Sequence, residues 1–152
     1  MSTALNVLHV VGAVFIVGPM AILPMSAMRS LRAGEASEVA ALAKSTQVFN
    51  LLSLVVAVLG FGVLAESDPA DQFSFTTPWI LISVIVYVVA LLLSIFVVVP
   101  AMRRASARLR VSSSSAEATV AGSDNGYAAV AASSGVVSIL LVVVVVLMVW
   151  KP

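Results

Sequence analysis

Four long stretches without a charged side chain constrain this chain more than any other feature. They cover residues 5–28, 45–65, 79–102 and 127–150 and contain no Asp, Glu, Lys or Arg. Each has about 20–25 residues, the length that a helix needs to cross a hydrocarbon core of about 30 Å. Because lipid offers no hydrogen-bond partners, such a run satisfies its backbone only as a helix. The sequence therefore predicts an all-α, integral membrane four-helix bundle, one transmembrane domain over residues 1–152.

The composition excludes several classes of protein. Only 10% of the residues are charged, whereas a soluble domain has about 25%. The net charge of +1 gives no reason to expect a nucleic-acid partner. The chain has no cysteine, so thiol nucleophiles and thiolate metal sites are excluded. The chain also lacks H-E-x-x-H, Walker-type and G-x-S-x-G motifs, and its spans lack the charged groups that pumps and proton-coupled carriers use. We therefore expect no enzyme.

The distribution of basic residues predicts the topology. Seven of the eight Lys and Arg fall in the connections 29–44 and 103–126, whereas every charged residue of the connection 66–78 is acidic. By the positive-inside rule, the first two are cytoplasmic loops, the third is external, and the N-terminus and C-terminus are both outside. We expect a multi-pass protein of a bacterial inner membrane whose arginines contact anionic lipid headgroups. These arginines are Arg29, Arg32, Arg103, Arg104, Arg108 and Arg110.

Small and weakly polar residues recur at spacings of three and four in three of the predicted helices. In lipid, helices associate through such faces because small side chains let the backbones approach. We expect helix packing there, and a ligand groove is the alternative. The residues are Gly12 and Gly18 in the first helix, Asn50, Ser53, Ala57 and Gly60 in the second, and Ala128, Ala131, Gly135 and Ser138 in the fourth.

Prolines and a short similarity link the two halves of the chain. Pro19 and Pro24 remove backbone donors and predict a kink in the inner half of the first helix. The two halves of the chain also share a short similarity: Leu23-Pro24 is followed by Met28-Arg29, and Val99-Pro100 is followed by Met102-Arg103. The halves are either a parallel repeat of one hairpin or two unrelated hairpins, and both interpretations remain open.

His9 is the only histidine, and it lies near the outer end of the first predicted helix. An imidazole can ligate haem or copper or carry a proton. A bis-histidine haem site would need a second chain, because this chain supplies one ligand. The other interpretation is a hydrogen bond to a neighbouring helix or headgroup. We expect no cofactor and no metal bound by this chain, with His9 as the one candidate ligand.

Two short motifs and the four-span pattern resemble a family of small bacterial integral membrane proteins of unknown function. The motifs are the opening Leu8-His9-Val10-Val11-Gly12-Ala13 followed by Gly18-Pro19, and the ending Leu147-Met148-Val149-Trp150-Lys151-Pro152. The opening also resembles copper-resistance and haem-handling membrane proteins, which have further histidines or charged residues in their helices.

Six Arg against two Lys in an Ala- and Val-rich chain suit a high-GC bacterium. In actinobacteria of this kind, small multi-span proteins are accessory subunits of the supercomplex of cytochrome bcc and its terminal oxidase. The leading hypothesis is therefore a non-catalytic accessory subunit that stabilises or assembles this respiratory complex by helix packing and lipid contacts. Its partners would be other integral membrane subunits, which would hold the haem and copper. The alternatives are a haem- or metal-handling protein using His9, and a small-molecule carrier.

Overall fold

The computed structural model describes residues 3–66, 77–114 and 121–150, and these form four long helices. The first comprises α1 (Thr3–Gly12), a π-helical turn η1 (Ala13–Val17) and α2 (Gly18–Ala33). The second is α3 (Ala36–Ala65). The third comprises α4 (Pro78–Leu93), a π-helical turn η3 (Ser94–Val98) and α5 (Val99–Ser114). The fourth is α6 (Ala121–Trp150).

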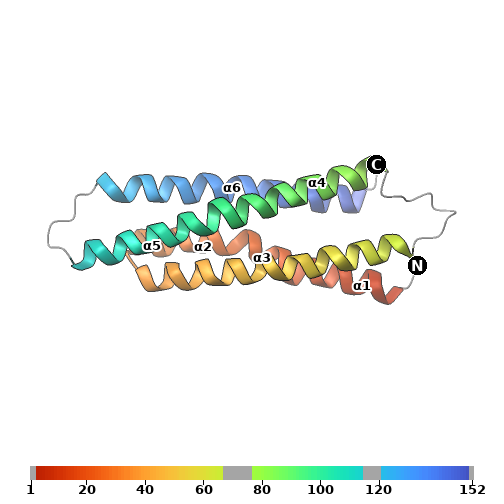
Figure 1. Ribbon diagram of the computed structural model, residues 1–152, viewed down its shortest axis with the longest axis horizontal. Coiled ribbons are helices and arrows are strands. Elements are labelled where there is room, and N and C mark those ends of the chain that lie inside the picture. The colour runs from red at the N-terminus through yellow and green to blue at the C-terminus, as the bar shows by residue number, and fades with distance from the viewer. Residues whose placement is uncertain (1–2, 67–76, 115–120, 151–152) are drawn as a thin grey trace.

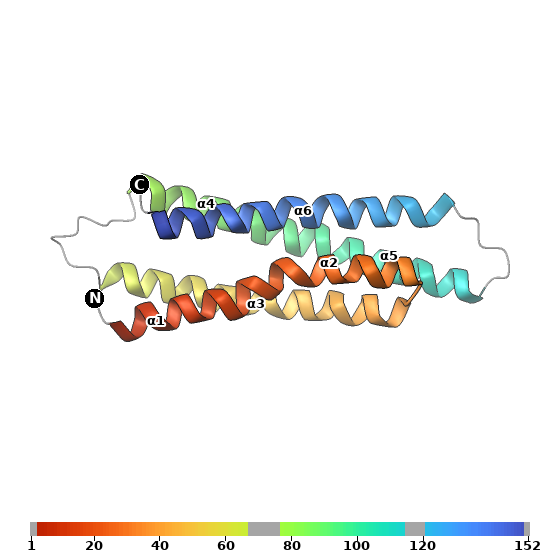
Figure 2. The same ribbon diagram turned by 180° about the vertical axis from the view of Figure 1, so that it is seen from behind.

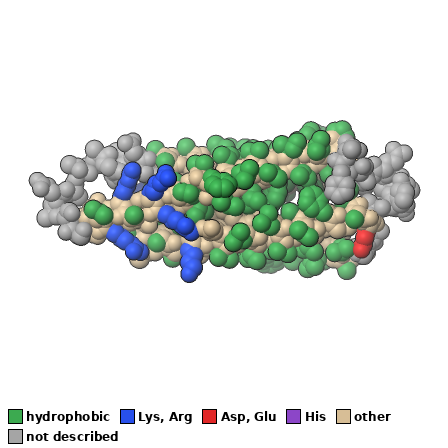
Figure 3. Space-filling model, in the orientation of Figure 1, with side chains coloured by type: hydrophobic (Ala, Val, Ile, Leu, Met, Phe, Trp, Pro, Cys, Tyr) green, Lys and Arg blue, Asp and Glu red, His purple; other side chains and the backbone are tan. Residues whose placement is uncertain are grey.

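All four helices are long and apolar enough to cross a membrane. The predicted all-α bundle of four spans is therefore confirmed. Figure 1 shows the helices running side by side, with the start of α1 and the end of α6 at the same end of the bundle. In the space-filling view, Lys and Arg gather toward the opposite end, and hydrophobic side chains cover the middle (Figure 3).

Helix occupies most of the predicted connections 29–44 and 103–126. Residues 29–33 continue α2 and residues 36–44 begin α3, so only a tight turn separates them. Residues 103–114 continue α5, and α6 already begins at residue 121. A charge-free run marks the part of a helix that lies in hydrocarbon. Arg, Lys, Glu and Ala are good helix formers, so the helices continue into the charged segments.

The tight turn between α2 and α3 depends on Gly34. This residue has a φ of 76° and lies in the left-handed region, which glycine enters without steric cost. The Gly34 N–H donates to the carbonyl oxygen of Leu31 at 3.2 Å, and the Glu35 N–H donates to that of Ser30 at 3.0 Å. These bonds satisfy the last carbonyls of α2 in the manner of a Schellman motif. The chain can therefore reverse within two residues.

The two π-helical turns stand directly before prolines. Pro19 is the second residue of α2, and Pro100 is the second residue of α5. A proline ring clashes with the carbonyl four residues before it, here that of Phe15 or Phe96, and the wider π turn relieves this clash. Pro19 and Pro100 thus stand in similar places relative to a π turn, whereas Pro24 lies inside α2, and a repeat of the two halves remains a prediction. Phe15 and Phe96 occupy equivalent places and are each 71% exposed.

The bundle core is formed by α2, α3, α4, η3, α5 and α6. α2 packs against α3 and α6, and α5 also packs against α3 and α6. Met20 and Met102 are fully buried there. α1 packs chiefly against α3 and has no buried residue. Figure 2 shows it lying along the C-terminal half of α3. Each half of the chain thus contributes one helix with a π turn and one continuous helix to a ring of four.

Candidate functional site

A cluster of four polar side chains crosses the contact between the second and third helices. Asn50 and Ser53 lie on α3, Tyr87 on α4, and Ser94 begins η3. The Ser94 hydroxyl donates to Asn50 Oδ1 at 3.0 Å. Ser53 Oγ donates to the backbone carbonyl of Asn50 at 2.7 Å and lies 2.8 Å from the Tyr87 hydroxyl oxygen. We call these four residues the polar cluster.

The hydrogens of the polar cluster can be assigned one by one. A serine hydroxyl has a single hydrogen, and Ser53 gives it to the Asn50 carbonyl. Tyr87 must therefore be the donor in its contact with Ser53. Both Asn50 and Ser53 are completely buried, so these bonds form in an apolar interior where they bind helices together.

One polar group of the cluster has no partner. Asn50 Nδ2 is buried and has no hydrogen bond to any described residue. A buried donor that is left unpaired costs about 1–3 kcal/mol. Other buried hydroxyls of the bundle do have partners. Thr46 donates to the Leu42 carbonyl, and Ser83 donates to the Trp79 carbonyl.

His9 is hydrogen-bonded to the backbone of α3. Its Nδ1 lies 2.9 Å from the carbonyl oxygen of Val56. A carbonyl only accepts, so in the neutral ring Nδ1 carries the hydrogen and Nε2 has the lone pair. The ring lies over Gly60, where an added Cβ would be 2.8 Å from His9 Cε1. The expected helix-to-helix hydrogen bond is therefore present, and Gly60 makes the space for it.

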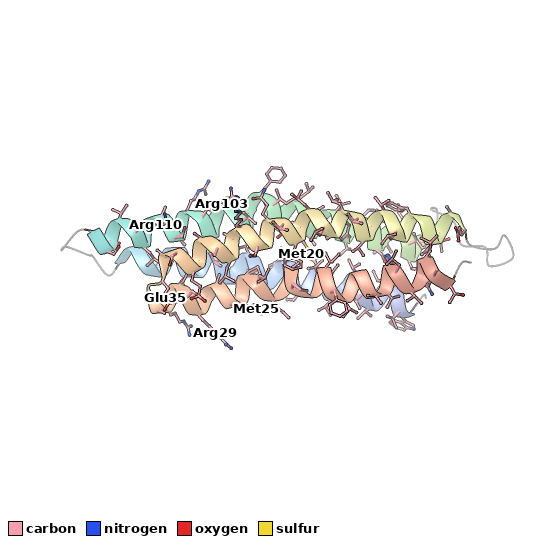
Figure 4. The ribbon with its side chains drawn as sticks, turned by 90° about the horizontal axis from the view of Figure 1, so that it is seen from below. Met20, Met25, Arg29, Glu35, Arg103 and Arg110 are labelled. Carbon is pink, nitrogen blue, oxygen red and sulfur yellow. The ribbon has the colours of Figure 1, made fainter. Side chains whose placement is uncertain are left out.

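The basic end carries two defined contacts among the predicted headgroup arginines. Arg32 donates to the Tyr127 hydroxyl at 2.6 Å, and its guanidinium carbon lies 4.6 Å from the centre of that ring. Arg103 donates to Gln47 Oε1. Figure 4 shows Arg29, Arg103 and Arg110 near the same end of the bundle, with Arg29 pointing away from it. All six predicted arginines are exposed, which is compatible with headgroup contact; that contact remains a prediction.

Two carboxyl groups interact where α2 turns into α3. Glu35 immediately precedes α3, and Glu38 lies in its first turn. The hydrogen bond with Glu38, together with the negative charge of Glu38, raises the pKa of the Glu35 carboxyl above its ordinary value. Both side chains are exposed, so this pair lies in contact with solvent or headgroups.

The predicted packing residues divide into two groups. Asn50 and Ser53 are buried, a Cβ on Gly12 would lie 3.2 Å from a methyl of Val56, and Ser138 Oγ donates to the Ala21 carbonyl at 3.3 Å. Gly60 lies against His9. These residues sit at helix contacts.

Three other predicted residues, Gly18, Ala128 and Gly135, lie outside close contacts. An added Cβ on Gly18 or Gly135 would meet no atom within 4 Å, and Ala128 is exposed. Ala57 and Ala131 are partly buried. The structure therefore does not bring these small residues into one continuous packing face.

For Tyr87, deep in the third predicted helix, the sequence favours a hydrogen bond to another helix, and its contact with Ser53 confirms this, whereas sequence reasoning did not include Ser94. The available signal was a stripe of polar residues on the third helix, because Ser83, Tyr87 and Ser94 are spaced by four and seven and share a face. Among the described residues, no group of three or more His, Cys, Asp or Glu could hold a metal ion. His9 could therefore be only one ligand of a larger set.

Comparison with known proteins gives one match. A protein-family model with the description "Predicted integral membrane protein (DUF2269)" matches residues 3–152. No curated protein and no solved structure matches the chain.

Proposed function

Because the chain belongs to the DUF2269 family of predicted integral membrane proteins, we propose a role for it from the geometry of its bundle. In this proposal the protein is a non-catalytic accessory subunit of a membrane respiratory complex of the cytochrome bcc–oxidase type. The protein would stabilise or assemble that complex through helix packing and lipid contacts, and the haem and copper would belong to the partner subunits.

The use of the polar side chains is the observation that carries this proposal. Ser53, Tyr87, Ser94 and His9 all hold one helix against another. Large apolar side chains face outward along all four helices, as Phe15 and Phe96 do. A bundle built in this way associates with lipid or with other apolar helices, because its outward surface offers them dispersion contacts.

The basic end supports the lipid part of the proposal. Arg29, Arg104, Arg108 and Arg110 are exposed, and their guanidinium groups have no hydrogen bond or ion pair with the described residues. Each Lys or Arg near an anionic membrane surface contributes about 1 kcal/mol of attraction. This end can therefore hold the subunit in register with the headgroup layer. The respiratory assignment itself rests on size, topology and composition.

Co-purification tests the accessory role. The tagged protein, extracted in a mild detergent, is expected to elute with haem-bearing subunits that show their absorbance bands. An untagged strain treated in the same way is the control for non-specific binding. If the tagged protein elutes alone and monodisperse while the oxidase elutes separately, the proposal is wrong.

A haem- or metal-handling protein is the second candidate, and the His9–Val56 bond favours it. Ligating histidines almost always donate their other ring N–H to a carbonyl, carboxylate or water, which fixes the tautomer. His9 has this arrangement on Nδ1. Haem added to the purified protein should then give a Soret band that His9→Ala abolishes. A preparation that is colourless, metal-free and unchanged by added haem contradicts this candidate.

A further inference from the structure

The polar cluster contains more hydrogen-bonding groups than helix packing requires. In the ring of four helices, the contact between the second and third helices corresponds to the contact between the fourth and first helices. Inside the bundle, packing across α2 and α6 uses one side-chain bond, from Ser138 Oγ to the Ala21 carbonyl, and the second bond between these helices, from Arg32 to Tyr127, lies at the exposed basic end. The corresponding contact in the other half has a buried amide and three hydroxyls. Two similar contacts thus differ in polarity.

The unpaired group lies in the middle of this polar contact. Asn50 is completely buried, its Oδ1 accepts from Ser94, and its Nδ2 has no partner among the described residues. Tyr87 donates its hydrogen to Ser53, so the Tyr87 oxygen can still accept a hydrogen bond. The cluster therefore has free donors at Asn50 Nδ2 and free acceptor lone pairs at Tyr87 and Ser94.

The surroundings of the cluster provide two directions of approach. Gln47 lies one helical turn from Asn50 toward the basic end, where Arg103 contacts it, and both of these groups attract water. Tyr87 is only partly buried, so its ring connects the cluster with the membrane side of α4. η3 begins at Ser94, and π turns are frequent at functional sites.

We propose that Asn50 Nδ2, with Tyr87 and Ser94 beside it, forms a binding site for one oxygen of a small neutral ligand. The required chemistry is a hydrogen-bond-accepting oxygen in an apolar setting. It comes either from a water molecule, which needs two to four polar partners, or from the carbonyl or hydroxyl group of a membrane-soluble molecule. The site does not depend on the accessory role, and it would exist whether or not the protein joins a respiratory complex.

The test uses the side-chain amide of Asn50 directly. The chain has three asparagines, Asn6, Asn50 and Asn125, so ¹⁵N-asparagine labelling of the full protein in lipid nanodiscs gives three side-chain amide signals. Asn50→Leu assigns the signal of interest. A cross-peak between the Asn50 amide and water identifies water as the occupant. A cross-peak to a non-exchanging organic proton, together with a molecule found by mass spectrometry in extracts of the wild-type protein, identifies a membrane-soluble ligand.

Matched variants separate binding from packing. Ser94→Ala removes the hydrogen bond to Asn50 Oδ1 and one acceptor of the site but keeps Nδ2, so the cross-peak should weaken. Ser134→Ala alters a buried hydroxyl whose bond stays within its own helix, and it should leave the cross-peak unchanged. An organic ligand should fall at least tenfold in amount in Asn50→Leu and remain unchanged in Ser134→Ala.

Two results overturn the proposal. One is a wild-type Asn50 amide with no cross-peak to water or to any organic molecule. The other is an organic molecule retained at the wild-type level by Asn50→Leu. The first measurement needs only the wild-type protein, and Ser94→Ala, which removes the bond to Asn50 Oδ1 and so shifts the Asn50 amide signal, confirms the assignment. The test therefore stands even if Asn50→Leu does not fold.

Discussion

The His9 Nδ1 atom lies 2.9 Å from the carbonyl oxygen of Val56, and this bond joins α1 to α3. The Val56 carbonyl belongs to a continuous helix and only accepts hydrogen bonds. The proton of the neutral imidazole is therefore on Nδ1, and Nε2 remains a base. Both the packing of α1 and the second candidate function depend on this one contact.

The tautomer of His9 is directly measurable. We expect the neutral ring to show its hydrogen on Nδ1 and none on Nε2 in the ¹⁵N spectrum of histidine-labelled protein. His9 is the only histidine, so no assignment is needed. A neutral ring with its hydrogen on Nε2 would show that the Val56 contact does not exist in the membrane.

Gly60→Ala should destabilise the contact between α1 and α3. The added Cβ would lie 2.8 Å from His9 Cε1, and overpacking of this kind costs about 1–3 kcal/mol. Unfolding in mixed micelles measures the loss. Gly135→Ala is the matched control, because its Cβ would meet no atom within 4 Å. Equal effects of the two substitutions would contradict the position of His9.

Tyr87 and Ser53 should be energetically coupled. A double-mutant cycle of Tyr87→Phe and Ser53→Ala is expected to give about 0.6 kcal/mol, the average for hydrogen bonds between membrane helices. A parallel cycle with Thr46→Val should give almost no coupling, because the Thr46 hydroxyl donates to the Leu42 carbonyl of its own helix. Coupling of the same size in both cycles would argue against a direct bond.

Gly34→Ala should weaken the turn between α2 and α3. The φ of 76° costs a residue with a Cβ about 1–2 kcal/mol. Gly34→Asn should lose less, since asparagine tolerates the left-handed region better. The free energies of unfolding of the two variants give the comparison. An alanine variant as stable as the asparagine variant would be incompatible with this turn.

The contact of Arg32 with Tyr127 should weaken in two steps. Tyr127→Phe removes the acceptor at 2.6 Å but keeps the ring beneath the guanidinium, whereas Tyr127→Leu removes both. Each step should cost up to about 1 kcal/mol at this exposed position. Arg104→Gln, which changes the same charge at another exposed arginine, provides the control for Arg32→Gln. If the two glutamine variants unfold alike, the contact contributes nothing to stability.

The sequence by itself determined the number of spans and the positions of the charged ends. Both follow from local properties, because a charge-free run in lipid must form its backbone hydrogen bonds within itself, as a helix does. It did not determine the helix ends, since α2, α3 and α5 continue past the apolar runs into charged residues that also favour helix.

Only the tertiary structure decided which polar groups meet. Asn50 contacts Ser94 from 44 positions away, and His9 contacts Val56 from 47 positions away. Each π turn holds one extra residue, which rotates the residues that follow by about 100° relative to a continuous helix. Faces drawn at regular helical spacing therefore fail beyond Val17 and Val98. The rotation of the four helices relative to one another places Gly60 against His9 and leaves Gly135 without a neighbour within 4 Å of an added Cβ.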